Sequence, residues 1–183
     1  DCGWLRFYPE LAVLQGCEQN PIWHPEGDVW IHTLHCLDWF AMESTGNQDD
    51  DLIVGLGILC HDFGKPATTS TDLGRITSRG QEPESEAPTR RFLERLTNQD
   101  DLINEVIPLV LCHLRPRALH EANASDNAVR RLARQVKRID RLVRVARAEV
   151  DKLTKELEAL NKKQPLPEAE IAAMKQRIEQ IKT

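Results

Sequence analysis

The sequence predicts an all-α protein, and three observations support this prediction. Apolar residues lie on every side of the segment 52–60, which is the pattern of a buried helix. The segment 139–163 places apolar residues three or four positions apart, as a helix face requires. No stretch alternates apolar and polar residues as a half-buried strand does, and no internal repeat occurs. With 183 residues, the chain is long enough for one well-buried domain.

The N-terminal part is expected to contain one long helix. Residues 4–15 form a short helix or turn packed by aromatic and leucine side chains, and a loop marked by Pro and Gly follows over 16–28. Asp28 is suited to cap the next helix, 29–42, because a carboxylate there accepts hydrogen bonds from the first backbone N–H groups of a helix.

The buried helix ends in two residues with metal-binding side chains. The apolar run 52–60 leads directly into His61 and Asp62, after which Gly64 and Pro66 stop the helix. Side chains at the end of a buried helix point into the protein. We therefore interpret the His–Asp pair as half of a metal site that other helices complete.

A long segment without periodicity follows at 67–88. It is rich in Thr, Ser, Gly and Pro, so we expect a surface loop with short extended pieces around 75–77. Because this loop leaves from the His–Asp end of the buried helix, we expect it to be functional. Helices are then predicted at 88–97, at 102–112 with Pro108 as a kink or break, at 126–137 after the cap Ser125, and at 139–163, with a loop at 115–124.

The C-terminal residues form a separate unit in this prediction. A turn at 164–167 joins two amphipathic helices, so we divide the chain into a helical domain over 1–150 and a C-terminal antiparallel helical hairpin over 151–183. The hairpin packs on its own domain or on a second copy, which leaves a homodimer open. The matching apolar seams are Leu153, Leu157 and Leu160 on one helix and Ile171, Met174, Ile178 and Ile181 on the other.

Charge is distributed unevenly along the chain, whose formal net charge is −5. Residues 1–60 contain ten acidic residues and one basic residue, whereas residues 115–147 contain ten basic and three acidic residues. A basic segment of this kind suits a phosphate-bearing ligand or nucleic acid. The alternative is a solvated helix face that pairs with the acidic half of the chain.

The composition indicates a cytoplasmic protein without a membrane partner. No run approaches the roughly 20 apolar residues of a membrane span, and there is no signal-peptide pattern. The five cysteines form no CxxC pair, so we interpret them as structural thiols and expect neither a disulfide nor a zinc–thiolate site. The chain begins with Asp1 rather than Met, which leaves open that it is part of a longer protein.

Other residues can complete the metal site. Phosphate chemistry at a divalent ion needs imidazole and carboxylate ligands with a position open for water. His32 or His35 on the helix 29–42 can supply a second imidazole. Glu149 is the one charged residue in the apolar stripe of the long helix, and a buried carboxylate needs a compensating partner. That partner is either a metal ion or a neighbouring arginine.

The order of His32, the His61–Asp62 pair and a later carboxylate resembles the HD superfamily of metal-dependent phosphohydrolases. More narrowly, the chain is similar to the C-terminal HD domain of bacterial tRNA nucleotidyltransferases, the multifunctional CCA proteins. The Gly-rich and paired-Asp motifs of the nucleotidyltransferase half are absent here. The resemblance covers about 1–150 and rests on residues 4–11, 23–38, 59–66, 74–80 and the Arg-rich segments up to Glu149.

The resemblance implies roles for individual residues. His32, His61 and Asp62 match the metal ligands of the family, and Glu149 stands where the family has its final Asp. Asp62 and Lys65 are the implied catalytic residues, since Lys65 matches the lysine of the HDxGK pattern. His113 is implied as a neighbour of the site or as a ligand of a second metal, and the candidates for binding substrate phosphate are Lys65, Arg115 and Arg147.

Two positions depart from the family pattern. Glu149 is one methylene longer than Asp, and Gln81 stands where many relatives have a histidine. Because glutamine replaces imidazole poorly, we expect one metal ion rather than two. Of the other histidines, His24 and His120 are expected to be exposed loop residues without a ligand, and His35 a core residue or a neighbour of the ligands.

The implied function is hydrolysis of phosphomonoesters or 2′,3′-cyclic phosphates with one divalent ion (Mg, Mn, Ni, Co, Fe or Zn). The substrates would be nucleotides or RNA ends, and tRNA a partner. The alternative is a catalytically degenerate HD domain that binds nucleotide or tRNA, which Gln81, Glu149 and the arginines of 115–147 favour. A plain helical scaffold is the third hypothesis, supported only by the C-terminal hairpin.

Overall fold

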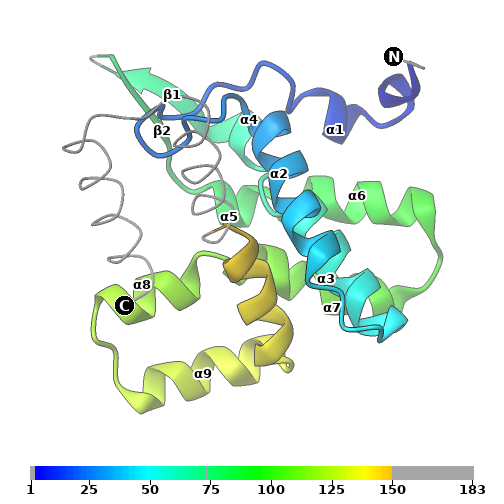
Figure 1. The fold of residues 1–183 in the computed structure, drawn as a ribbon, viewed down its shortest axis with the longest axis vertical. Coiled ribbons are helices and arrows are strands. Elements are labelled where there is room, and N and C mark those ends of the chain that lie inside the picture. Colours follow the sequence, from blue (N-terminus) through cyan, green and yellow to red (C-terminus); the bar gives the residue numbers. More distant parts are fainter. Residues whose placement is uncertain (1–2, 73, 150–183) are drawn as a thin grey trace.

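The computed structural model describes residues 3–72 and 74–149, and within them the prediction of an all-α fold is confirmed (Figure 1). The predicted hairpin over 151–183 lies outside the described residues. The longer helices are α2 (Val29–Met42), α3 (Gln48–Cys60), α6 (Glu86–Leu96), α7 (Asp100–Cys112), α9 (Asp126–Val136) and the helical residues 139–149. The shorter ones are a 3₁₀ turn at Trp4–Phe7, α1 (Pro9–Ala12), α4 (Lys65–Thr68), α5 (Gln81–Glu84) and α8 (Arg115–Glu121).

Helix α2 begins where the sequence predicts because Asp28 caps it. One carboxylate oxygen of Asp28 accepts a hydrogen bond from the backbone N–H of Ile31 at 2.9 Å. The other accepts from the N–H of Gly16 at 2.7 Å, which ties down the preceding loop. Asn47 caps α3 in the same way, with its side chain accepting from the N–H of Asp50.

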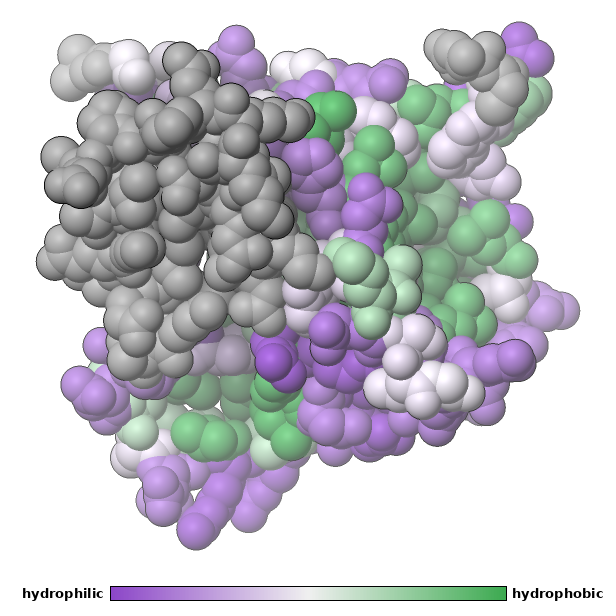
Figure 2. All heavy atoms as spheres, viewed as in Figure 1, coloured by the Kyte–Doolittle hydropathy of each residue, from purple (hydrophilic) through white to green (hydrophobic). Residues whose placement is uncertain are grey.

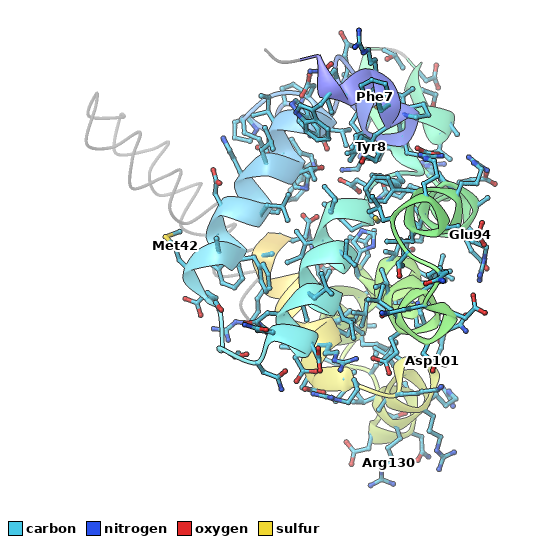
Figure 3. The ribbon with its side chains drawn as sticks, turned by 90° about the vertical axis from the view of Figure 1, so that its right-hand side faces the viewer. Phe7, Tyr8, Met42, Glu94, Asp101 and Arg130 are labelled. Carbon is cyan, nitrogen blue, oxygen red and sulfur yellow. The ribbon has the colours of Figure 1, made fainter. Side chains whose placement is uncertain are left out.

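Helix α3 lies at the centre of the core. Figure 3 shows it between α2 on one side and the end-on helices α6 and α7 on the other. Val54 and Ile58 on α3 are fully buried in the apolar cluster that joins these helices. A Cβ at Gly57 would lie 3.3 Å from Val145 and 3.5 Å from Leu109, so this glycine lets α3 approach two helices closely. The site at the end of α3 is therefore held by a rigid support.

The segment 67–88 is more ordered than the sequence predicts. Strands β1 (Thr69–Asp72) and β2 (Arg75–Ser78) form an antiparallel hairpin in which Thr69 is opposite Ser78. The extended piece around 75–77 is confirmed, whereas the expectation of a loop through to residue 88 is wrong, because α5 and the start of α6 also lie in this segment. These short polar strands carry no apolar alternation that would have revealed them.

Proline led to one further error in the predicted elements and left two alternatives open at a second position. The segment 115–124 was expected to be a loop, but it contains α8, in which Pro116 stands in the first turn. The first turn tolerates proline because its backbone N–H groups have no partner within the helix. Pro108 lies inside α7, which continues through it, so the alternative of a break is wrong and the kink stays a prediction.

Three arginines of the basic segment 115–147 pair with the acidic N-terminal part of the chain, as one of the two interpretations predicts. Arg138 and Arg141 form ion pairs with Asp50, and Arg144 lies 2.5 Å from Asp51. The arginines of α9 differ, because they are exposed (Figure 3 labels Arg130 at the outer edge). Figure 2 shows hydrophilic side chains projecting at the α9 end of this face, with some hydrophobic side chains between them.

Two expectations from composition can be compared with the structure. Of the described cysteines, Cys36, Cys60 and Cys112 are buried, Cys17 is half-buried, and all four are free thiols, as predicted. Among the described residues, the structure contains no helix with the length and apolarity of a membrane span.

Candidate metal centre

The His–Asp end of α3 is clamped against α5 by close backbone contact. A Cβ at Gly64 would lie 2.0 Å from the carbonyl oxygen of Gln81, so only glycine fits there. The hydroxyl of Ser85 accepts from the N–H of Gly64 at 2.8 Å and donates to the carbonyl of Gln81 at 2.9 Å. With φ at −82°, Gly64 is required for this close approach and not for a left-handed backbone conformation, a role that its place after the helix did not reveal.

Three buried histidines use the same nitrogen for support. His61 and His113 follow the C-terminal ends of α3 and α7, and each donates Nδ1–H to the backbone carbonyl three residues earlier, at 2.5 and 2.7 Å. His32 on α2 donates Nδ1–H to Oε1 of Glu26 at 2.8 Å. These partners assign the neutral tautomer with the lone pair on Nε2. Such support of Nδ1 is typical of histidines that bind metal through Nε2.

Nitrogen and oxygen atoms from three helices converge at one point. The Nε2 atoms of His32 and His61 are 3.2 Å apart, and Oε1 of Glu149 lies 3.0 and 2.7 Å from them. Oδ2 of Asp62 lies 3.0 Å from Nε2 of His61 and 3.5 Å from Nε2 of His32. Ligands that share an ion at about 2.0–2.2 Å are separated by about 3–3.5 Å. The four side chains therefore fit one divalent ion.

Two polar atoms beside this point have no protein partner. Oδ1 of Asp62 and Nε2 of His113 are buried and lack a hydrogen-bond partner among the described residues, and they are 4.0 Å apart. A buried polar atom without a partner costs free energy, so such atoms need an ion, water or ligand. Their position extends the donor cluster toward the neighbouring cavity.

Lys65 places a cation at the edge of the cluster. Its Nζ atom donates to Oε1 of Gln19 at 2.6 Å and lies 2.7 Å from Oδ2 of Asp62. Only 9% of its side chain is exposed. Burial would lower the pKa of Lys65, but the carboxylates of Asp62 and Glu149 outweigh burial and raise it, so this lysine remains charged.

Without an ion, protons compensate the carboxylates of the cluster. Burial alone would lower the pKa of His61, but Asp62 and Glu149 outweigh it and raise the pKa to about 10. Burial and the neighbouring His61 instead lower the pKa of His113 to about 4. The imidazoles and Lys65 keep the pKa values of Asp62 and Glu149 well below the usual range, in spite of burial. A divalent ion would replace the shared protons.

A cavity of about 740 Å³ opens beside the cluster. Asp62, Lys65, His113 and Glu149 belong to its lining. Trp23, which is 40% exposed, and Arg117 line it too, and the guanidinium of Arg117 lies 5.4 Å from the centre of the Trp23 ring. The remaining lining comes from Gln19, Asn20, His24, Ile76, Thr77, Ser78, Gln81, Leu114, Pro116, His120, Val143, Ala146 and Arg147.

The structure brings most of the predicted site residues together. The four predicted ligands meet at the cluster, with Lys65 and His113 beside Asp62 and with Arg147 and Gln81 in the cavity lining. Arg115 is exposed and does not line the cavity. Arg117 lines the cavity in its place.

The other histidines are placed differently from one another. His24 was expected to be exposed, but only 20% of its side chain is exposed and its Nδ1 is 3.0 Å from Glu26. His120 is exposed as expected, although it lies on α8 rather than in a loop. His35 is half-buried. Among the described residues it belongs to neither of the two groups of side chains that could hold a metal ion, which are His32, Cys36, His61 and Glu149, and His24, Glu26 and His32.

Two residues near the cluster were not among the candidates predicted from the sequence. Glu26, whose side chain is fully buried, supports both His24 and His32, yet in the sequence it resembles any acidic loop residue. Cys36 belongs to one donor group with His32, His61 and Glu149, in which all donor atoms lie within 4.8 Å of one another. Its spacing of four residues from His32 on a helix was the signal that could have revealed it.

Comparisons with known proteins find curated relatives that share one name. The most similar relatives include multifunctional CCA proteins of Laribacter hongkongensis (40% identity over 97 residues), Pasteurella multocida (34% over 88 residues) and Acinetobacter baumannii (34% over 97 residues). The aligned segments cover 52%, 48% and 52% of this chain but only 22%, 20% and 22% of the relatives. The chain thus spans about a fifth of the length of the curated relatives it matches. No solved structure matches.

The family comparison covers the same helices that build the cluster. The HD domain matches residues 29–146, which is more than half of the chain and runs from the first residue of α2 almost to Glu149. Proteins with this domain form a superfamily of metal-dependent phosphohydrolases, and the cluster described above has the donors that a divalent ion requires. The chain therefore belongs to the HD domain family.

Proposed function

We propose that this HD domain hydrolyses phosphomonoesters or 2′,3′-cyclic phosphates of nucleotides or RNA ends with one divalent ion. The observation that carries the proposal is the convergence of buried imidazole nitrogens and carboxylates beside a cavity of about 740 Å³. The ligands would be His32, His61, Asp62 and Glu149. We place the domain over 1–150, around the matched residues 29–146, with 151–183 as an extension.

The roles of the ion and of the polar side chains follow from their chemistry. A bound divalent ion polarises a phosphoryl oxygen and lowers the pKa of water. Oδ1 of Asp62, which lacks a partner among the described residues, would accept a hydrogen bond from the attacking water and orient it. Lys65, held by Gln19, would bind the phosphoryl oxygens as negative charge develops on them. Arg147 lines the same cavity and would bind phosphate as well.

His113 would act beside the single ion. Its Nε2 is oriented toward Asp62 and lacks a hydrogen-bond partner among the residues described, so it can accept a hydrogen bond from substrate or water. A second ion would need a further strong donor at the position of Gln81, whose amide oxygen is a weaker ligand than imidazole. We therefore propose one ion rather than two.

The cavity favours a nucleotide over a small phosphate ester. Its volume lies within the range of about 300–1,000 Å³ that small-molecule sites occupy. Trp23 offers a flat surface on which a base can stack. The guanidinium of Arg117 already forms a cation–π contact with this ring. Similarity to proteins named multifunctional CCA protein supports nucleotide or RNA-end substrates, with tRNA as a partner.

Hydrolysis assays with defined ions test the proposal. Adenosine 2′,3′-cyclic phosphate and adenosine 2′-phosphate are incubated with chelator-treated protein and Mg, Mn, Fe, Co, Ni or Zn. We expect turnover with at least one ion, and we expect Lys65→Met to reduce kcat/KM by at least about tenfold through loss of charge stabilisation. Protein that binds metal but hydrolyses neither ester with any ion contradicts the proposal.

The second candidate is a binding module that lacks turnover, and the exposed arginines of α9 favour it. Arg130, Arg131 and Arg134 are exposed on one short helix, whereas Arg141 and Arg144 are held by acidic side chains. This candidate predicts tRNA binding that weakens with salt and is lost in Arg130→Glu/Arg134→Glu but not in Arg6→Glu. Binding without turnover would establish the module, whereas turnover in the ion assay would establish the enzyme.

A further inference from the structure

A thiol lies within the cluster that the sequence analysis assigned to imidazole and carboxylate alone. Sγ of Cys36 belongs to the same donor group as Nε2 of His32, Nε2 of His61 and a carboxylate oxygen of Glu149. All four donor atoms lie within 4.8 Å of one another. Cys36 and His32 are fully buried, so solvent does not compete for the thiol.

The geometry of Cys36 is that of a ligand next to His32. The two residues are one helical turn apart on α2 and therefore share a face. Sγ lies 3.8 Å from Nε2 of His32, the same nitrogen that points into the cluster. A sulfur and a nitrogen that bind one tetrahedral ion, at about 2.3 and 2.1 Å, are separated by about 3.6 Å.

Burial alone does not explain this position. Cys60 and Cys112 are as deeply buried as Cys36, and each directly precedes a histidine of the site. Neither belongs to a donor group among the described residues, although Cys60 is adjacent in sequence to His61. The helix register of α2 thus directs one particular thiol toward the donors, while the other buried thiols only pack in the core.

We propose that Cys36 binds the metal ion through its thiolate and that the site selects a zinc-like ion (Zn, Co or Ni) over Mg or Mn. Thiolate is a soft ligand that favours these ions, whereas Mg and Mn prefer carboxylate and water. On binding, the S–H proton leaves to solvent and sulfur donates its electron pair to the ion. The inference rests on the proposed function for the presence of an ion at this cluster, and it adds thiolate as a third kind of donor and a metal preference.

Cobalt substitution tests the proposal directly. Chelator-treated full-length chain is loaded with Co, and its absorption is recorded with bound cobalt measured by elemental analysis. We expect a near-ultraviolet thiolate-to-cobalt charge-transfer band in the wild type and in the matched control Cys60→Ser. We expect Cys36→Ser to lose this band while the weaker visible bands of bound cobalt remain.

The outcomes distinguish a failure of the Cys36 assignment from a failure of the proposed metal site. Bound cobalt without a charge-transfer band in the wild type overturns the role of Cys36 and leaves the proposed function intact, and so does a band that persists in Cys36→Ser. Failure of the wild type to bind cobalt, zinc or manganese overturns the proposed metal site together with this inference. A band that disappears only in Cys36→Ser supports the assignment.

One further measurement uses the wild type alone and so does not depend on the folding of a variant, and a second compares metal affinities. Cadmium NMR of the wild type distinguishes a thiolate ligand, which moves the resonance far downfield, from a site of nitrogen and oxygen alone. Competition with a chelator compares affinities, and we expect Cys36→Ala to weaken zinc binding at least about tenfold while manganese binding changes less than about threefold. Equal losses for both ions in folded protein contradict the proposal.

Discussion

Oε1 of Glu26 lies 2.8 Å from Nδ1 of His32, and both side chains are fully buried. This contact fixes the imidazole so that Nε2 points toward His61 and Glu149. The same oxygen lies 3.0 Å from Nδ1 of His24. Glu26 thus orients a histidine of the proposed metal site without lying in the donor cluster itself.

Replacing Glu26 by glutamine is expected to weaken metal binding. An amide cannot support the imidazole as a carboxylate does, and partners of this kind contribute about 10–100-fold to metal affinity. Chelator competition measures the change, with Glu18→Gln, an exposed acid of the same loop, as the control. An unchanged affinity in folded Glu26→Gln would show that the contact is only structural.

The fold could be predicted from the sequence where burial and caps determine it. The apolar run of α3 and the cap Asp28 of α2 each have one physical interpretation, and the structure agrees with both. The hairpin and α8 could not be predicted, because short polar strands lack periodicity and Pro116 marks either a loop or a first helical turn. Those elements depend on tertiary contacts that no local pattern reveals.

The candidate site was predictable only in part. His61 and Asp62 follow a buried helix, and Glu149 interrupts an apolar stripe, so local pattern alone singles them out. Supporting residues of the site could not be predicted, because only the folded chain brings them to their partners. Glu26 supports His32 from a loop, and Gln19 contacts Lys65, which is 46 positions away in the chain. The exact role of Gly64 was also hidden, because its contact with α5 is not encoded nearby in sequence.

Gly64→Ala is expected to destabilise the domain. The added Cβ would lie 2.0 Å from the carbonyl oxygen of Gln81, a backbone atom that cannot move without displacing α5. We expect the free energy of unfolding to fall by about 3 kcal/mol in urea denaturation. In the control Gly55→Ala the Cβ meets the ring edge of Phe40 at 3.2 Å, and a change within about 1 kcal/mol is expected. Equal effects of the two substitutions would contradict the close-contact role.

The ion pair between Asp51 and Arg144 is expected to make the free energy of unfolding depend on pH in the acidic range. Hydrogen bonds from Ser44 and Arg144 hold the pKa of Asp51 well below its ordinary value of 3.8. A lowered pKa in the folded state contributes stability above the unfolded pKa, and this contribution is lost as pH falls through the folded value. Urea denaturation should therefore show Asp51→Asn less stable than the wild type at pH 7, with a smaller difference at pH 3. A difference that grows on acidification would refute this assignment.

Trp23→Ala is expected to discriminate between substrates. If a base stacks on Trp23, its removal should raise KM for adenosine 2′,3′-cyclic phosphate about tenfold, since stacking is worth about 1–3 kcal/mol per base. Glycerol 2-phosphate has no base, so its kinetics should not change. Ile22→Ala, a substitution of an adjacent side chain that is 64% exposed, serves as the control. Equal effects on both esters would exclude a base-binding role.

The number of metal ions bound per chain shows whether the cluster at the end of α3 is a metal site. Chelator-treated protein is dialysed against Zn, Co, Ni or Mn, and the bound metal per chain is measured by elemental analysis for the wild type, His61→Ala and Asp62→Ala, with His35→Gln as a control on α2. The convergence of His32, His61, Asp62 and Glu149 predicts one ion per chain in the wild type and in His35→Gln, and a loss of that ion in His61→Ala and Asp62→Ala. Wild-type protein that binds none of these ions, or variants that bind as much as the wild type, would contradict the account.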